Sequence, residues 1–207
     1  YVKADCVYSV YYPMITFMLS TGCRISETLG LTWDDIDFKN KTVSINHQVI
    51  YKKVLGKQLH FVAPPKNGES RIIPLQDDII DIMKEHKRKT YFASKMSGCE
   101  LEGYSNFVFL NRKNKLNCSG TVVRAFHGIR DSYNKSRDVD EVELPDFTPH
   151  TLRHTACTRY AENGMDVKVL QVIMGHKDIS ITMQVYNHVD EPRASKEVER
   201  VKSTLAI

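Results

Sequence analysis

The sequence contains no long apolar run, no internal repeat and no low-complexity tract. A helix that crosses a membrane needs about 20 consecutive apolar residues, and a secretory leader needs a charged start followed by an apolar stretch. Neither pattern is present, so the sequence excludes an integral membrane protein and gives no export signal. We therefore expect a soluble protein of the cytoplasm.

The cysteines are few and scattered, and no two of them form a C-x-x-C pair. Their number is odd, which argues against a disulfide framework that pairs every cysteine. Histidines and cysteines also lack the spacing that a zinc site requires. Reduced thiols are expected at all five positions, which are Cys6, Cys23, Cys99, Cys118 and Cys157.

Charge of one sign is only slightly in excess. A net charge of +4 suits a nucleic-acid partner without demanding one. The 207 residues are enough for one substantial core, and a hydrophobic content of 42% is ordinary for a globular chain. We therefore expect one main domain in which the basic residues are separated in space from the acidic ones.

Local signals predict three helices in the last third of the chain. The first begins at the N-cap Thr148, followed by Pro149, and ends near Gly164. The second spans Asp166–Met174, and Gly175 terminates it. The third begins at Asp178 or Ser180 and carries Tyr186 near its far end. In the second helix the residues expected to face inward are Val169, Leu170 and Ile173.

Periodicity predicts the remaining elements. An apolar stripe from Val7 to Met18 predicts a helix already in progress at Tyr1. Two further helices are expected over Gln76–Lys95 and from a Ser119 cap to Tyr133. Runs rich in β-branched and aromatic residues predict an antiparallel sheet and a separate short buried strand. The sheet strands are Thr42–Tyr51, Lys57–Ala63 and Ser70–Leu75, and the buried strand is Phe107–Leu110.

Four residues of the last third could act together on a phosphate: His150, Arg153, His176 and Tyr186. Phosphoryl transfer needs a nucleophile and cations that stabilise charge on the non-bridging oxygens. The guanidinium of Arg153 can bind two phosphate oxygens at once. His150 lies three residues earlier, so both side chains emerge on one helix face.

Each of these residues alone also fits an ordinary structural role. A His-x-x-Arg pair on a helix is usually part of a solvated face, and a histidine after glycine is usually a loop residue. Most of the 10 tyrosines are expected to pack their rings in the core with the hydroxyl at its edge. Only a match in order and spacing along the chain lifts the set above these alternatives.

Such a match is present over about residues 21–187, where the sequence resembles the tyrosine recombinases of the phage-integrase family. Arg153 and His176 are 23 residues apart and His176 and Tyr186 are 10 apart, as in that family. The resemblance is most like the integrases of conjugative transposons. The matching motifs are Thr21–Glu27 with Leu29–Trp33, His150–Thr155, Met174–His176 and Thr182–Tyr186.

The resemblance implies an α+β fold, a mostly helical catalytic domain with a small antiparallel three-stranded sheet. The catalytic domain is expected over residues 1–190 and a C-terminal tail helix over 191–207, docked on its own or a neighbouring protomer. A core-binding domain usually precedes the catalytic domain and is absent from this chain.

The resemblance also implies the chemistry. Tyr186 is the expected nucleophile, and it would form a covalent 3′-phosphotyrosyl link to DNA. Arg24 and Arg153 would clamp the non-bridging oxygens, and His176 would donate a further hydrogen bond. His150 is a candidate base. The scheme needs no metal and no cofactor.

Lys66, in the turn after the second strand, matches the position of a mobile catalytic lysine, which would protonate the departing 5′-oxygen. The alternative is a solvated turn lysine. Glu27 is interpreted as orienting Arg24, with an exposed helix-surface carboxylate as the alternative. Lys52, Lys53 and Lys57 are candidates for sequence-independent contacts with the DNA backbone, or serve solubility.

The expected function is that of a site-specific DNA recombinase or integrase, which moves a mobile element through a Holliday junction. Its expected partner is double-stranded DNA. The protein is expected to be a homotetramer on DNA and a monomer in its absence, and an accessory excision factor is a possible further partner. We expect it in the bacterial cytoplasm at the nucleoid. Type IB topoisomerase activity and a catalytically silent DNA-binding module are the alternatives.

Overall fold

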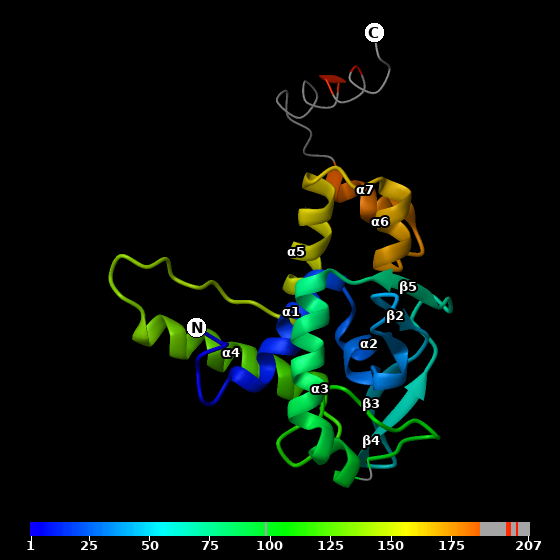
Figure 1. The fold of residues 1–207 in the computed structure, drawn as a ribbon, viewed down its shortest axis with the longest axis vertical. Helices are drawn as coiled ribbons and strands as arrows, with labels where there is room; N and C mark the ends of the chain where they lie inside the picture. The colour runs from blue at the N-terminus through cyan, green and yellow to red at the C-terminus, as the bar shows by residue number, and fades with distance from the viewer. Residues whose placement is uncertain (98, 187–197, 200–201, 203–207) are drawn as a thin grey trace.

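The computed structural model describes residues 1–97, 99–186, 198–199 and 202 (Figure 1). Helix α3 lies beside the strands and packs on α1, α4 extends away from the strands on the other side, and α5, α6 and α7 gather at one end of the molecule next to β5 (Figure 1). The elements in chain order are the 3₁₀ helix η1 (Ser9–Tyr11), α1 (Tyr12–Thr21), α2 (Ile25–Gly30), η2 (Trp33–Asp35), β1 (Ile36–Asp37), β2 (Thr42–Ile45), β3 (Gln48–Val54), β4 (Lys57–Ala63), β5 (Arg71–Pro74), α3 (Asp77–Ser97), α4 (Ser119–Ser136), α5 (Pro149–Glu162), α6 (Val167–Met174) and α7 (Ile179–Tyr186).

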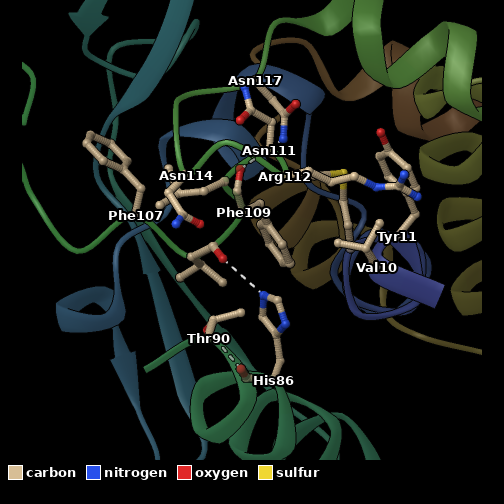
Figure 2. A pocket seen from close by; sticks show the side chains of 13 residues that line it. Val10, Tyr11, His86, Thr90, Phe107, Phe109, Asn111, Arg112, Asn114 and Asn117 are labelled. Atoms are coloured by element: carbon tan, nitrogen blue, oxygen red, sulfur yellow. Dashed lines mark hydrogen bonds between the residues drawn. The ribbon is translucent and has the colours of Figure 1, made fainter. Parts of the chain in front are cut away.

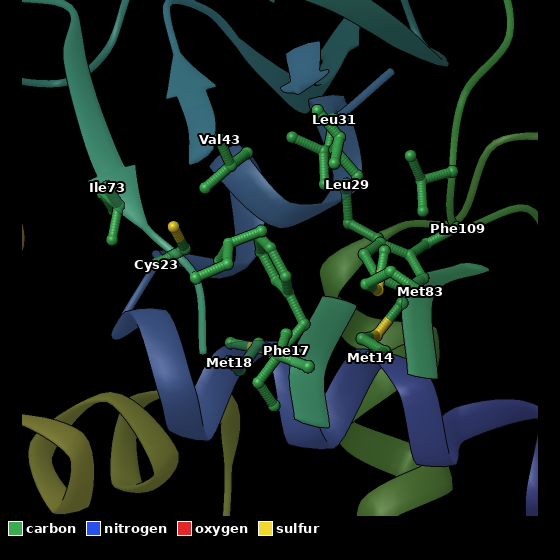
Figure 3. Close-up of a cluster of buried hydrophobic side chains, with 14 of the residues drawn as sticks. Met14, Phe17, Met18, Cys23, Leu29, Leu31, Val43, Ile73, Met83 and Phe109 are labelled. Atoms are coloured by element: carbon green, nitrogen blue, oxygen red, sulfur yellow. The ribbon is translucent and has the colours of Figure 1, made fainter. Parts of the chain in front are cut away.

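The main hydrophobic core joins α1 and α3 to the sheet (Figure 3). Phe17 and Met18 of α1 and Met83 of α3 are fully buried, and they belong to one cluster with Val43 of β2 and Ile73 of β5. Each large apolar side chain buried in this way stabilises the fold by about 1.5–3 kcal/mol. The core therefore holds α1, and the turn that follows it, at a fixed place beside β5.

Gly22 ends α1 in the left-handed conformation, with φ of 63°. A Cβ atom at this position would lie 2.5 Å from the side chain of Met174 on α6. The backbone conformation therefore favours glycine, and the missing side chain leaves room for the end of the Met174 side chain. The end of α1 and the end of α6 meet here.

The strands form two small antiparallel sheets. In one, β2 pairs with both β1 and β5, and in the other β3 pairs with β4. The expected mixed fold with a small antiparallel three-stranded sheet is thus present, but the three segments predicted to form that sheet do not all belong to it. The three-stranded sheet contains β1, β2 and β5, and the pair β3 and β4 is a separate hairpin.

The predicted single strand Thr42–Tyr51 is divided between β2 and β3. His47 Nε2 donates a hydrogen bond to the carbonyl of Gly30 at 2.7 Å, and Asn46 Nδ2 donates to Asp35 at 2.8 Å. These long-range bonds tether the two residues to α2 and η2, so the backbone leaves the β2 ladder. No local sequence pattern predicts this break in the strand.

The prediction of a helix from the first residue is also wrong. Residues 1–8 form turns in which Asp5 Oδ1 accepts hydrogen bonds from the N–H groups of Val7 and Tyr8. Pro13 lies in the first turn of α1, which is the part of a helix that tolerates proline. The helix therefore begins beside this proline rather than earlier.

Two smaller predictions need correction. Phe107–Phe109 is buried as expected and Leu110 is partly buried, but the segment makes only isolated bridges to Thr32 and Leu116 and is not a ladder strand. Helix α4 begins at Ser119 with Cys118, rather than Ser119, as its N-cap. Neither change moves the elements that carry the candidate site.

The three C-terminal helices are confirmed. The Thr148 side chain accepts a hydrogen bond from the Thr151 N–H, Asp166 caps α6 in the same way, and Gly175 ends α6 with φ of 61°. The apolar side chains of α5 and α6 form a second, smaller core. Its buried members are Ala156, Cys157, Ala161, Leu170 and Met174.

The inward face of α6 differs from the prediction at one position. Val169 is 50% exposed, whereas Leu170 and Met174 are fully buried and Ile173 is partly buried. Positions 170 and 174 lie one turn apart on the same face, which turns the neighbouring valine outward.

In the described part of the chain, none of the helices combines the length and apolarity that a membrane crossing requires. The predicted tail helix over 191–207 falls almost wholly outside the described residues and stays a prediction.

Candidate active site

Arg24 and Glu27 are joined at the first turn of α2. Arg24 is the N-cap residue, and its N–H and Nη1 donate to the two carboxylate oxygens of Glu27 at 2.9 and 3.0 Å. Glu27 is only 1% exposed, which excludes the exposed-carboxylate alternative. Its contacts support the interpretation that it orients Arg24.

Arg71, at the start of β5, is the second partner of Glu27. Its Nη1 and Nη2 donate to the carboxylate at 3.1 and 2.7 Å, and its Nε donates to the carbonyl of Ile173 at 2.7 Å. The Arg71 side chain is 4% exposed. Arg71 therefore binds α2 and the end of α6 to β5, with all three of its side-chain nitrogens donating to protein oxygens.

The Glu27 carboxylate is charged in this setting. Burial acts to raise its pKa, but hydrogen bonds and charge from Arg71 and Arg24 outweigh burial, and the pKa lies below its ordinary value. Burial likewise acts to lower the pKa of Arg71, and the bond to Glu27 outweighs it and raises that pKa. The pair is ionised on both sides, as a buried bidentate pair requires.

Arg153, on α5, is buried and fixed by backbone carbonyls. Its Nη1 donates to Gly22 at 2.6 Å and its Nη2 to Met174 at 2.5 Å. Burial, and then the positive charge of Arg24, lower its pKa to about 10. The guanidinium still carries its charge at neutral pH, but that charge lacks a carboxylate of its own.

His176 follows Gly175 at the end of α6. Burial, and then the charges of Arg153, Arg24 and Arg71, lower its pKa to about 4. Its Nδ1 lies 2.9 Å from the hydroxyl oxygen of Thr182 on α7. Next to it, Arg24 Nη2 donates to the carbonyl of Gly175 at 2.9 Å. The structure thus brings Arg24, Arg153 and His176 together from three parts of the chain.

A cavity of about 360 Å³ opens beside these groups, and His150, Arg153 and His176 all line it. The shared face predicted for His150 and Arg153 is therefore present. His150 itself is exposed. The cavity can admit a phosphate to one buried cation and two imidazoles.

Tyr186 does not point into this cavity. Its hydroxyl donates a hydrogen bond to the carbonyl of Met165, between α5 and α6, and its ring packs on the smaller core. It is not among the residues that line the cavity. The predicted nucleophile therefore lies next to the site, with its hydroxyl engaged elsewhere.

The predicted lysines are all exposed. Lys66 lies in the turn between β4 and β5, and the next residue, Asn67, lines a cavity of about 260 Å³ that His176 also lines. Lys66 is thus at the edge of the site without contacting it. At the far end of the β3 and β4 hairpin lie Lys52, Lys53 and Lys57.

Sequence reasoning missed Arg71 and the role of Thr182. Arg71 alternates with Ile73 and Leu75, and all three are buried. Since alternate residues of a strand share a face, this register could have revealed a buried arginine. Thr182 is fully buried, but no local pattern distinguishes it from other helical threonines.

Another cavity, of about 160 Å³, lies between α1, α3 and the segment 107–117 (Figure 2). His86 lines it, and its Nε2 donates to the carbonyl of Val108 at 3.0 Å. Burial lowers the pKa of His86. None of the predicted catalytic residues lines this cavity, so the candidate site is the one beside Arg153.

Among the residues that the structure describes, no three His, Cys, Asp or Glu side chains are grouped so that they could hold a metal ion. Asp35 and Asp37, which cluster in the sequence, instead accept hydrogen bonds from nearby backbone N–H groups.

Comparison with known proteins gives consistent matches. The model of the phage integrase family matches residues 2–193. The chain is 39% identical to the transposase from transposon Tn916 of Enterococcus faecalis over 203 residues, which cover 97% of this chain and 48% of that protein. It is 29% identical to the tyrosine recombinase XerD of Staphylococcus saprophyticus over 185 residues, 88% of this chain and 51% of that protein.

A solved structure of the Tn1549 transposon integrase in complex with a circular intermediate DNA has a TM-score of 0.82 and 33% identity, and covers 96% of this chain and 61% of that one. The XerA recombinase, at 19% identity and a TM-score of 0.63, shares the fold. The chain spans about half the length of the curated relatives it matches.

Replacing Arg71 by methionine should destabilise the domain by about 3–5 kcal/mol, because one partner of a buried ion pair is left alone. Urea denaturation measures the loss. Arg130 makes exposed ion pairs with Asp131 and Asp146, and Arg130→Met should cost much less. Equal losses in the two variants would contradict the central place of Arg71.

Stability should also depend on pH through His176. In the unfolded chain this histidine takes up a proton near its ordinary pKa of 6.5, whereas in the folded protein it stays neutral down to a pKa of about 4. Its contribution is therefore present above pH 6.5 and is lost as the pH falls toward 4. We expect the melting temperature of His176→Gln to fall less steeply than that of the wild type over this window, and parallel curves would refute the depressed pKa.

Proposed function

The chain belongs to the phage integrase family, and we propose that it is the catalytic part of a site-specific DNA recombinase that integrates or excises a mobile element. The observation that carries the proposal is the convergence of Arg24, Arg153 and His176 at the end of α6. Among the described residues, Arg24, Arg71 and Arg153 face a single carboxylate, that of Glu27. The excess positive charge suits a DNA phosphate.

Arg24 and Arg153 keep N–H donors that a phosphate requires. A guanidinium has five N–H groups, and within the described residues Arg24 donates two through its side chain and Arg153 donates two. The remaining N–H groups can bind the non-bridging oxygens of the scissile phosphate. The Arg71 guanidinium donates instead to Glu27 and Ile173, so its role is to hold the other two arginines in place.

The proposed reaction begins with attack of the Tyr186 oxygen on phosphorus. The bond between phosphorus and the 5′-oxygen breaks, and a 3′-phosphotyrosyl bond forms in its place. The phenol proton leaves to His150, the candidate base, and Lys66 gives a proton to the 5′-oxygen. Attack by a 5′-hydroxyl of the partner strand reverses these steps and rejoins the DNA.

The present position of Tyr186 adds one requirement. Its hydroxyl must leave the carbonyl of Met165 and turn toward the cavity beside Arg153 before it can attack. A phenol has a pKa of about 10, and nearby cations lower such a value. The proton therefore becomes removable only once the ring has entered the positive site.

Strand exchange between two duplexes passes through a four-way junction and needs an active site on each strand. The proposal therefore includes a homotetramer on double-stranded DNA and a monomer in its absence, with an accessory factor for excision. Relatives with the same fold were solved with DNA, among them the Tn1549 integrase with transposon right end DNA. The reaction would take place in the bacterial cytoplasm, at the nucleoid.

The nucleophile can be tested by covalent capture. The protein is mixed with a pool of nicked duplexes of randomised central sequence, and protein-linked DNA is recovered under denaturing conditions. We expect an adduct with the wild type and with Tyr51→Phe, which alters an exposed tyrosine of β3, and none with Tyr186→Phe. An adduct that persists without the Tyr186 hydroxyl would refute the proposal, and adduct formation without exchange between two duplexes would indicate a topoisomerase.

Lys66 can be tested by changing the leaving atom. On a DNA site recovered by covalent capture, with the normal 5′-bridging oxygen, Lys66→Ala should cleave about 10²–10⁴-fold more slowly, as for loss of a general acid. A 5′-bridging sulfur leaves without a proton, so the same variant should cleave that DNA almost as fast as the wild type. Lys52→Ala should affect both substrates equally. Equal slowing of both substrates by Lys66→Ala would assign Lys66 a binding role instead.

A further inference from the structure

His176 stands between the two cavities of the site and lines both of them. On one side of the ring, Nδ1 lies 2.9 Å from the hydroxyl oxygen of Thr182. On the other side, Nε2 has no hydrogen-bond partner within the described residues. Whatever this ring presents to a phosphate is therefore decided by the nitrogen that carries its proton.

The ring is neutral in the folded protein. It is partly buried and surrounded by the positive charges of Arg153, Arg24 and Arg71, and these conditions lower its pKa to about 4. A neutral imidazole has one N–H donor and one acceptor nitrogen. Two arrangements of the proton are then possible, and they differ in their consequences for Thr182.

In the first arrangement Nδ1–H donates to the Thr182 oxygen. The Thr182 hydroxyl then has no acceptor among the described residues, although the side chain is fully buried, and an unpaired buried donor is unfavourable. In addition, the lone pair of Nε2 would face the site and repel a phosphate oxygen.

In the second arrangement the Thr182 hydroxyl donates to Nδ1, and the proton of the ring resides on Nε2. Both buried groups are then paired, and Nε2–H is free to donate to an anion. The second arrangement therefore pairs the Thr182 hydroxyl on one side of the ring and offers an N–H donor to a phosphate on the other. In metal centres, too, the bond made by one ring nitrogen sets the role of the other.

We propose that Thr182 is a positioning residue that holds His176 as the Nε2–H tautomer, with this N–H directed at the scissile phosphate. The inference rests on the proposed function for its role in cleavage, but its structural part concerns the free protein alone. Thr182 acts through His176 and touches no substrate.

The same bond links the phosphate site to the helix of the nucleophile. Thr182 and Tyr186 lie four residues apart on α7, and positions so spaced share one helix face. By binding His176 at the end of α6, Thr182 fixes α7 relative to Arg153 and Arg24. The threonine thus aligns a donor of the site and the helix that must deliver the tyrosine.

Two substitutions separate the hydroxyl from its shape. Thr182→Val keeps the branched side chain and removes the hydroxyl, whereas Thr182→Ser keeps the hydroxyl. Thr16→Val is the matched control, because Thr16 donates to the carbonyls of Tyr12 and Pro13 on α1, far from His176 in the chain. Thermal unfolding confirms that each variant folds.

The first measurement is made without DNA. Nitrogen-15 NMR of the ring at neutral pH distinguishes the protonated nitrogen from the bare one. We expect the Nε2–H form of His176 in the wild type, in Thr182→Ser and in Thr16→Val, and an increased share of the Nδ1–H form in Thr182→Val. A wild-type ring protonated on Nδ1, or an unchanged ring in Thr182→Val, would overturn the assignment.

The second measurement is the cleavage rate on a captured nicked duplex. Thr182→Val should cleave about 10–100-fold more slowly, by analogy with the loss of a group that orients a metal-binding histidine. DNA affinity should be unchanged, and the serine variant should restore the rate. An unchanged rate would overturn the positioning role. If the wild type does not cleave DNA at all, the proposed function fails, and the NMR result still decides the tautomer.

Discussion

The site depends on the burial of one negative charge, the carboxylate of Glu27. A buried charge is tolerated only when it is paired and hydrogen-bonded, and here Arg24 and Arg71 satisfy both oxygens. These two arginines also bind the carbonyls of Gly175 and Ile173. Through them the carboxylate fixes α2, β5 and the end of α6 relative to one another, and hence fixes His176.

The same arrangement leaves the site short of negative charge. Glu27 neutralises one of the guanidinium groups around it, and in the described part of the chain the hydrogen-bond acceptors of Arg153 are carbonyl oxygens. Burial first, and then this excess of positive charge, lowers the pKa of Arg153 and of His176. On the proposed function, a bound phosphate would relieve this repulsion, which is the usual exchange of stability for function at a preorganised site.

Sequence reasoning succeeded where the physics is local. The caps at Thr148 and Asp166 and the left-handed Gly175 are set by neighbours within a few residues, so the three C-terminal helices could be predicted. It failed where distant segments decide. The break between β2 and β3 comes from bonds to α2 and η2, and the burial of Arg71 comes from Glu27 and Ile173. The family resemblance supplied the predicted catalytic residues and Glu27 as the partner of Arg24, but not Arg71 or the bond between Thr182 and His176.

The bonds that close the site join residues very far apart in the chain. Arg153 reaches Gly22 across 131 residues, Arg71 reaches Ile173 across 102, and Arg24 reaches Gly175 across 151. Such contacts form late, because the entropy of closing long loops must be overcome first. A chain emerging from the ribosome from its N-terminus thus holds no assembled phosphate site until α6 has been made. On the proposed function, an unfinished chain would therefore be unable to cleave DNA.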